Sequence, residues 1–160
     1  MASSVITSGT AVASTSGTSI DFTGIPSWVK RITVMFNSVS TNGTSNMVIQ
    51  IGDSGGAETT GYVNTIGNTT GASANAGATY TNGCNVPDYA AASSISGQVV
   101  FSNLSGNNWV FSGLIADPST PRIIYTAGVK SLSDTLDRVR ITTTNGTDTF
   151  DAGSINILYE

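Results

Sequence analysis

The sequence contains no histidine, a single cysteine and few charged residues. Without histidine, the usual Ser-His-Asp triads, the usual zinc and iron sites and the usual general base at neutral pH are absent. Cys84 stands alone, so an intramolecular disulfide and a Cys-rich zinc site are excluded. We read it as an unreactive small residue in a loop, because no nearby positive charge would lower the pKa of its thiol. The sequence therefore predicts no catalytic residue, no metal and no cofactor, and we expect the protein not to be an enzyme.

Positive charge and long apolar runs are also scarce. Six basic residues stand against ten acidic ones, which gives a formal net charge of −4, and such a chain is a poor partner for nucleic acid. Residues 1–17 lack the basic start and the continuous apolar stretch of a signal peptide. No run approaches the roughly 18 apolar residues that a membrane helix needs. We expect neither secretion by a signal peptide nor membrane insertion.

Small uncharged polar residues fill much of the chain. Ser (22), Thr (23), Asn (13) and Gly (18) together make 76 of the 160 residues. Ser, Thr and Asn compete for backbone hydrogen bonds and Gly has the largest conformational entropy, so helices are disfavoured, whereas Thr, Val, Ile and aromatic residues favour strands. The composition excludes an all-helical protein and favours an all-β one.

The clearest strand signal lies at residues 31–38. Ile32, Val34 and Phe36 alternate with more polar neighbours, the period of two expected of a half-buried antiparallel strand. An Asn42-Gly43 turn signal follows, and residues 46–52 form the predicted returning strand. We place the side chains of Ile32, Val34 and Phe36 on the core face.

Similar segments recur along the chain at spacings typical of sandwiches. Besides the two above, the predicted strands cover residues 20–22, 62–64, 78–80, 98–104, 109–116, 122–130, 136–144 and 154–159. Their number and spacing predict an all-β fold, an antiparallel β-sandwich that is jelly-roll-like. Residues 1–19 are predicted to form an extended N-terminal arm or edge strand that a partner orders, and residues 20–160 a single domain.

The stretch from Asp53 to Ala92 lacks periodicity. Within it, Gly67 to Gly77 is predicted to be a long loop, which in a compact domain is functional or ordered by a partner. Tyr62, Tyr80 and Tyr89 lie in this stretch and are the candidate recognition or interface residues, because tyrosine rings offer contact area at little entropic cost. The competing interpretation is that these rings pack on their own domain.

Trp28 and Trp109 are either core residues or platforms on which a sugar ring stacks. For Trp109, which is flanked by Val110 and Phe111, we favour the core or a subunit interface.

Paired carboxylates are the remaining acid–base chemistry. The three pairs in or beside predicted turns are Asp134 with Asp137, Asp148 with Asp151, and Asp53 with Glu58. We interpret them first as caps of turn amides, with calcium ligation and glycosidic catalysis as the alternatives.

Two segments resemble structural proteins of tailed bacteriophages and prophages. The first runs from Ser16 to Phe36 (SGTSIDFTGIPSWVKRITVMF) and continues from Val39 to Asn46, and the second is the ending FDAGSINILYE, residues 150–160. The resemblance implies localisation in the virion, with other virion proteins, a tail protein or the major capsid protein, as partners. It carries no functional residue over, and it does not extend to residues 53–100.

Three functional hypotheses follow. The first is a trimeric fibre- or tip-type β domain that mediates attachment to the host, through a surface glycan or protein, or to the virion. The second is a head decoration (cement) protein that stabilises the capsid, and the third, of another class, is a carbohydrate-binding module, which requires an exposed aromatic platform. We expect a homotrimer, because a β domain of low charge gains burial by closing into a cyclic oligomer.

Overall fold

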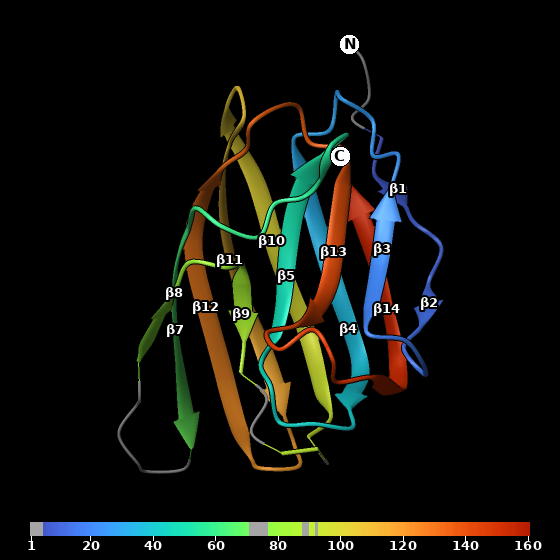
Figure 1. Ribbon diagram of the computed structural model, residues 1–160, viewed down its shortest axis with the longest axis vertical. Helices are drawn as coiled ribbons and strands as arrows, with labels where there is room; N and C mark the ends of the chain where they lie inside the picture. The colour runs from blue at the N-terminus through green and yellow to red at the C-terminus, as the bar shows by residue number, and fades with distance from the viewer. Residues whose placement is uncertain (1–4, 71–76, 88–89, 92) are drawn as a thin grey trace.

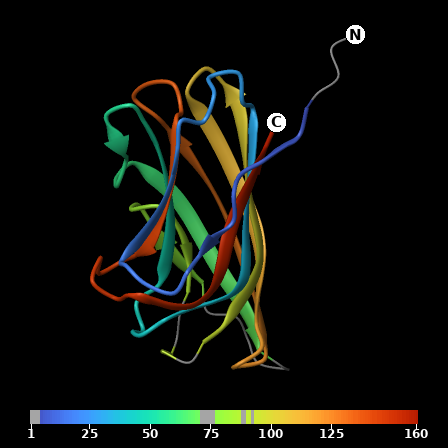
Figure 2. The same ribbon diagram turned by 90° about the vertical axis from the view of Figure 1, so that its right-hand side faces the viewer.

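The chain folds into two antiparallel β-sheets that pack face to face. A computed structural model describes residues 5–70, 77–87, 90–91 and 93–160, and within these residues every regular element is a strand. Figure 2 shows the two sheets as two layers. Over the same residues, no helix is long and apolar enough to cross a membrane. The predicted all-β antiparallel sandwich is confirmed.

The larger sheet has nine strands. Its order is β1-β14-β4-β10-β11-β12-β7-β8, and β2 also pairs with β14 (Figure 1). The bounds are β1 (Thr7–Ser8), β2 (Val12–Ala13), β4 (Arg31–Thr41), β7 (Tyr62–Thr70), β8 (Ala78–Tyr80), β10 (Ile95–Ser105), β11 (Asn108–Asp117), β12 (Arg122–Ser131) and β14 (Phe150–Tyr159).

The smaller sheet has five strands in the order β3-β13-β5-β6, with β9 also on β5. The bounds are β3 (Ser19–Thr23), β5 (Met47–Asp53), β6 (Gly56–Ala57), β9 (Cys84–Val86) and β13 (Arg138–Thr143).

The long strands pair as a nested series. The hairpin of β10 and β11 is innermost, and around it β7 pairs with β12, β5 with β13, and β4 with β14. A jelly roll also folds a nested series of antiparallel pairs, but it divides eight strands between two sheets. Here only β5 and β13 of this series belong to the smaller sheet. The finer assignment to a jelly roll stays a prediction.

The core fills the space between the sheets, as the alternation in β4 predicts. Ile32 and Val34 are 0% exposed and Phe36 is 4% exposed, whereas Arg31 and Asn37 are exposed. Neighbouring strands contribute rings to the same layer, with the centroids of Phe101 and Phe111 5.2 Å apart. The placement of the β4 core face is confirmed.

The described part of the N-terminal segment lies along the edge of the larger sheet. Gly9 N donates to Ile157 O at 2.8 Å, and Ser14 Oγ donates to Ala152 O at 2.7 Å. Ser14 is fully buried, whereas Val5 and Ile6 remain exposed. Residues 5–14 thus add two short edge strands to β14.

The predicted loop from Gly67 to Gly77 begins too early. Residues 67–70 belong to β7 and pair with β12, while residues 71–76 lie outside the described residues. Gly67 packs closely under a ring, because a Cβ at this position would lie 2.4 Å from Cε2 of Tyr125 on β12 and would displace that side chain. Gly67 suggested a loop in the sequence, but in the structure it leaves space for the Tyr125 ring on the neighbouring strand.

Candidate functional site

The three candidate tyrosines differ in environment. Tyr62 is 1% exposed, and its hydroxyl accepts a hydrogen bond from Ile51 N at 2.8 Å and donates one to Ile51 O at 3.1 Å. Its ring therefore packs in the core and offers no surface for recognition. Tyr80 is half-buried at the edge strand β8, where its hydroxyl accepts from Asn46 Nδ2 at 3.0 Å. Tyr89 lies outside the described residues.

Cys84 is a core residue of β9 and not a loop residue. Its Sγ lies 3.5 Å from Thr126 Oγ1, and its side chain is completely buried. Burial raises the pKa of this thiol to about 12, against which the contact with Thr126 has a smaller opposing effect. A thiol with so high a pKa stays protonated at neutral pH, so it is a poor nucleophile.

The candidate carboxylates hold loops together. Ser133 Oγ lies 2.6 Å from Asp53 Oδ2 and 2.9 Å from Glu58 Oε1, and Glu58 also forms an ion pair with Lys130. The other carboxylates are similarly engaged: Asp134 and Asp148 accept from backbone amides, Asp137 pairs with Arg138, and Asp151 accepts from Ser40. Within the described residues, no group of three or more His, Cys, Asp or Glu side chains is arranged to hold a metal.

A buried ion pair at the β11–β12 turn is absent from the sequence-based predictions. Arg122 Nε donates to Asp117 Oδ2 at 3.1 Å, while Asp117 Oδ1 accepts from Ser119 N at 3.0 Å. Burial opposes ionisation of Asp117, but hydrogen bonds from Arg122 and Ser93 outweigh it and hold the pKa below its usual value. Its sequence signal is a pair of opposite charges at the two ends of a Pro-containing turn.

The face of the larger sheet that points away from the core is apolar over β7, β11 and β12; we call it the outer face. Its large exposed side chains are Val63, Val110, Leu114, Ile123, Tyr125 and Val129. The charged residues of these three strands, Asp117, Arg122 and Lys130, are at most 8% exposed. The outer face therefore presents no exposed charge along these strands.

The outer-face residues stand in rows across the strands. Val63, Val129 and Val110 occupy neighbouring register positions in one row. Leu114 and Tyr125 are cross-strand partners in another, and a shallow hollow lies beside them over β10, β11 and β12. Cross-strand rows of this kind give a continuous surface, not scattered apolar atoms.

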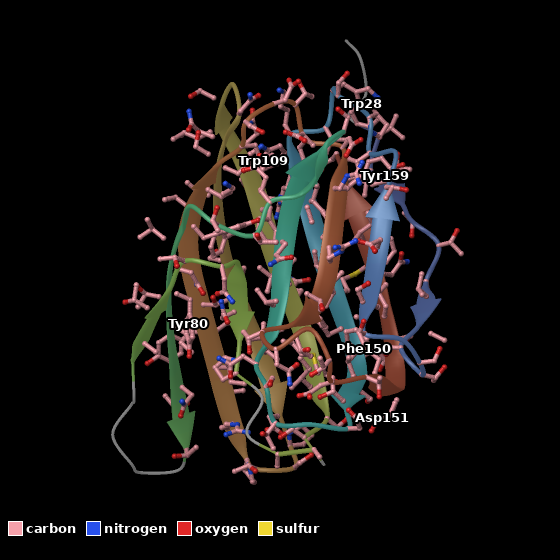
Figure 3. All side chains as sticks on the ribbon, in the orientation of Figure 1. Trp28, Tyr80, Trp109, Phe150, Asp151 and Tyr159 are labelled. Atoms are coloured by element: carbon pink, nitrogen blue, oxygen red, sulfur yellow. The ribbon has the colours of Figure 1, made fainter. Side chains whose placement is uncertain are left out.

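The two tryptophans have opposite environments at one end of the sandwich (Figure 3). Trp109 is 3% exposed and lies in the core, as predicted, although its Nε1 has no hydrogen-bond partner within the described structure. Trp28 is 53% exposed, and its ring centroid lies 6.0 Å from that of Tyr159. Trp28 thus meets the requirement for an exposed aromatic platform.

No protein-family model matches the chain, and no curated protein matches it either.

Proposed function

We propose that the protein is a structural subunit of a tailed-phage virion, a homotrimeric fibre- or tip-type β domain that mediates attachment to the host or to the virion. The outer face carries this proposal. The resemblance of residues 16–36 and 150–160 to phage structural proteins supports the virion as its location.

The area of the outer face fits subunit contact. The exposed fractions of its six large apolar side chains correspond to an apolar area on the order of 500 Å², near the upper end of patches on monomeric proteins. Stable interfaces bury about 800 Å² on each partner, and the Ser, Thr and Ala residues interleaved on the same strands supply the remainder. The absence of exposed charge also favours a second copy of this chain, since like charges would not meet across the contact.

A cyclic trimer buries such a face in every copy, because no copy stands at an open end of the assembly. In a cyclic trimer each copy contacts one neighbour with one part of its surface and the other neighbour with a different part, and the ring closes. Three copies that turn their outer faces toward a common axis would bury Leu114 and Val129 of each copy. The smaller sheet, whose outward side bears the exposed ion pair of Arg140 and Asp21, would then face solvent.

We expect Leu114→Lys to dissociate the trimer. The substitution places a charge at the middle of the proposed contact, where it would have to be desolvated. Native mass spectrometry at micromolar concentration should give three chain masses for the wild-type protein and one for the variant. The matched control is Thr23→Lys, on an exposed position of β3 in the smaller sheet, which should stay trimeric. A monomeric wild-type protein, or a trimeric Leu114→Lys variant, would contradict the proposed assembly.

We also expect no hydrolysis of host polysaccharides or peptidoglycan. The candidate carboxylates in the described residues accept from hydroxyls and turn amides or pair with cations, and the sequence has no histidine to act as a base. Reducing-end assays over long incubation measure this directly. Reproducible hydrolysis that Asp53→Asn abolishes would show that the protein is an enzyme.

The position of the protein in the virion distinguishes the attachment role from the capsid-decoration role. The density of the trimer in an electron-microscopy map of the intact virion should lie on the tail or its fibres. Density on the head lattice would instead favour the cement role.

A further inference from the structure

We infer that the end of the sandwich around Trp28 binds a neutral saccharide. The site consists of the exposed Trp28 ring, the Tyr159 ring beside it, and two hollows, the first lined by Tyr159 and the second by Ser27, Val29 and Lys30 of the loop that carries Trp28. It lies at one end of the sandwich, with the first hollow over β4 and β14, and not over β7, β11 and β12, through which the subunits are proposed to assemble.

The backbone presents Trp28 rigidly. On either side of it along the chain, Ile25 and Val29 are 5% and 3% exposed. Ile25 N donates to Asp137 O at 2.9 Å, and Val29 N donates to Pro26 O at 3.0 Å. A ring held out of the core by anchored neighbours does not fill space inside the domain. It offers a flat apolar surface that is already ordered in the folded protein, so little conformational entropy is lost when a ligand binds to it.

The Tyr159 ring extends this platform. It lies at an interplanar angle of 49° to Trp28, so the two rings form a bent surface and not a stack. Tyr159 also lines the first hollow, together with Arg31, Thr33 and Leu158. Aromatic surface next to a largely apolar hollow that also carries Arg31, Thr33 and Glu160 suits a pyranose, because its C–H face packs on a ring while its hydroxyls form hydrogen bonds.

The second hollow supplies hydrogen-bonding groups. The side chains of Ser27, Asn107 and Thr135 line it and form no hydrogen bond to any other described residue. Trp109 is part of the same wall, and its buried Nε1–H has no acceptor in the described structure. A buried donor without an acceptor is unfavourable, so a ligand oxygen that reaches this N–H would supply a partner that the described residues do not provide.

The charges of the site favour an uncharged ligand. Arg31 Nη1 pairs with Glu160 Oε1 at 3.0 Å, and Lys30 Nζ donates to Asn103 Oδ1 at 3.4 Å. Glu160 thus offsets the charge of Arg31, and the polar side chains that line the second hollow beside Lys30 are hydroxyls and amides. These donate and accept equally well, which suits the hydroxyls of a neutral sugar better than an anionic group.

The test uses the two indole N–H signals of the full-length protein labelled with nitrogen-15. Methyl glycosides of glucose, galactose, mannose and N-acetylglucosamine are titrated separately into the protein. At least one should shift the Trp28 and Trp109 signals saturably. Trp28→Ala should weaken that binding at least about tenfold, as loss of a central aromatic contact does, while Trp28→Phe should keep part of it.

Tyr80→Ala is the matched control, since it removes a half-buried ring from β8, at the opposite edge of the larger sheet from β14, and it should bind the sugar like the wild-type protein. The inference is overturned if no glycoside of the panel shifts the Trp28 signal, or if only methyl glucuronide, added as the acidic comparison, does so. It is also overturned if Trp28→Ala lowers the oligomeric state in native mass spectrometry, because the ring would then be an interface residue. The titration reads binding to the protein itself, so its result is separate from the location of the protein in the virion.

Discussion

Truncation of Phe36 to alanine is expected to lower the free energy of unfolding by about 3 to 5 kcal/mol. The ring is 4% exposed on β4, between Gly97 of β10 and Ile155 of β14. Removing it leaves a cavity in the middle of the larger sheet, which the neighbouring strands fill only in part. Denaturant unfolding of the two proteins measures the difference.

Thr33→Ala is the internal control for this experiment. Thr33 lies on the same strand but points away from the core and is half-buried, so its loss should cost well under half as much. Equal losses for the two variants would mean that both faces of β4 are buried, as they would be if β4 rather than β7, β11 and β12 formed the centre of the subunit contact.

Substitution of Asp117 by alanine is expected to be as destabilising, by about 3 to 5 kcal/mol. The carboxylate is 0% exposed and faces the guanidinium of Arg122, which is 8% exposed. Its removal withdraws an anion from a buried cation and frees the backbone amide of Ser119, which Asp117 caps.

The exposed pair of Asp21 and Arg140 is the matched control, because it joins the same two residue types at 2.7 Å on the smaller sheet. Asp21→Ala should cost at most about 1 kcal/mol. If Asp117→Ala lowers the free energy of unfolding no more than Asp21→Ala does, burial does not determine how much the ion pair contributes to stability.

The same buried pair predicts a pH dependence. The pKa of Asp117 in the folded protein lies below its usual value, so the folded state binds the proton less tightly than the unfolded chain does. This stabilisation is complete above about pH 4, the ordinary pKa range of aspartate, and is lost as the pH falls through the folded pKa. Asp117→Ala should therefore show a smaller loss of stability between pH 5 and pH 2 than the wild-type protein, in thermal melts.

The alternation of apolar and polar residues made most of the strands predictable, because burial of one face of a strand gives a hydrophobic period of two in the sequence. It works for Ile32, Val34 and Phe36 of β4, where polar neighbours mark the outside. It does not reveal which strands pair: β4 lies between β10 and β14, and no local feature of any of the three encodes that choice. The pairing depends on contacts between residues far apart in sequence.

The candidate site was less predictable because the exposure of its residues also depends on contacts between residues far apart in sequence. Tyr62 lies in a stretch that lacks periodicity, which suggested a recognition surface, but its position in β7 turns its ring toward the core. Trp28 could be named from the sequence only as core or platform, because its exposure depends on how the loop after β3 is anchored by Asp137, more than 100 residues away. The outer face was missed because some of its residues, such as Val110 and Ile123, stand directly beside equally apolar core residues in the sequence.

The nested pairing of the strands has a consequence for the order in which the protein can fold as it is synthesised. The innermost hairpin, β10 with β11, completes itself within 23 residues, from Ile95 to Asp117. By contrast β4 emerges early and must wait for β14, the last strand of the chain, before its second edge is covered. Until then an apolar strand edge stays open to pairing with another chain, a known route to aggregation. In a nascent chain that is released before Phe150, the second edge of β4 is therefore exposed. The ten residues of β14 cover this edge and complete the larger sheet.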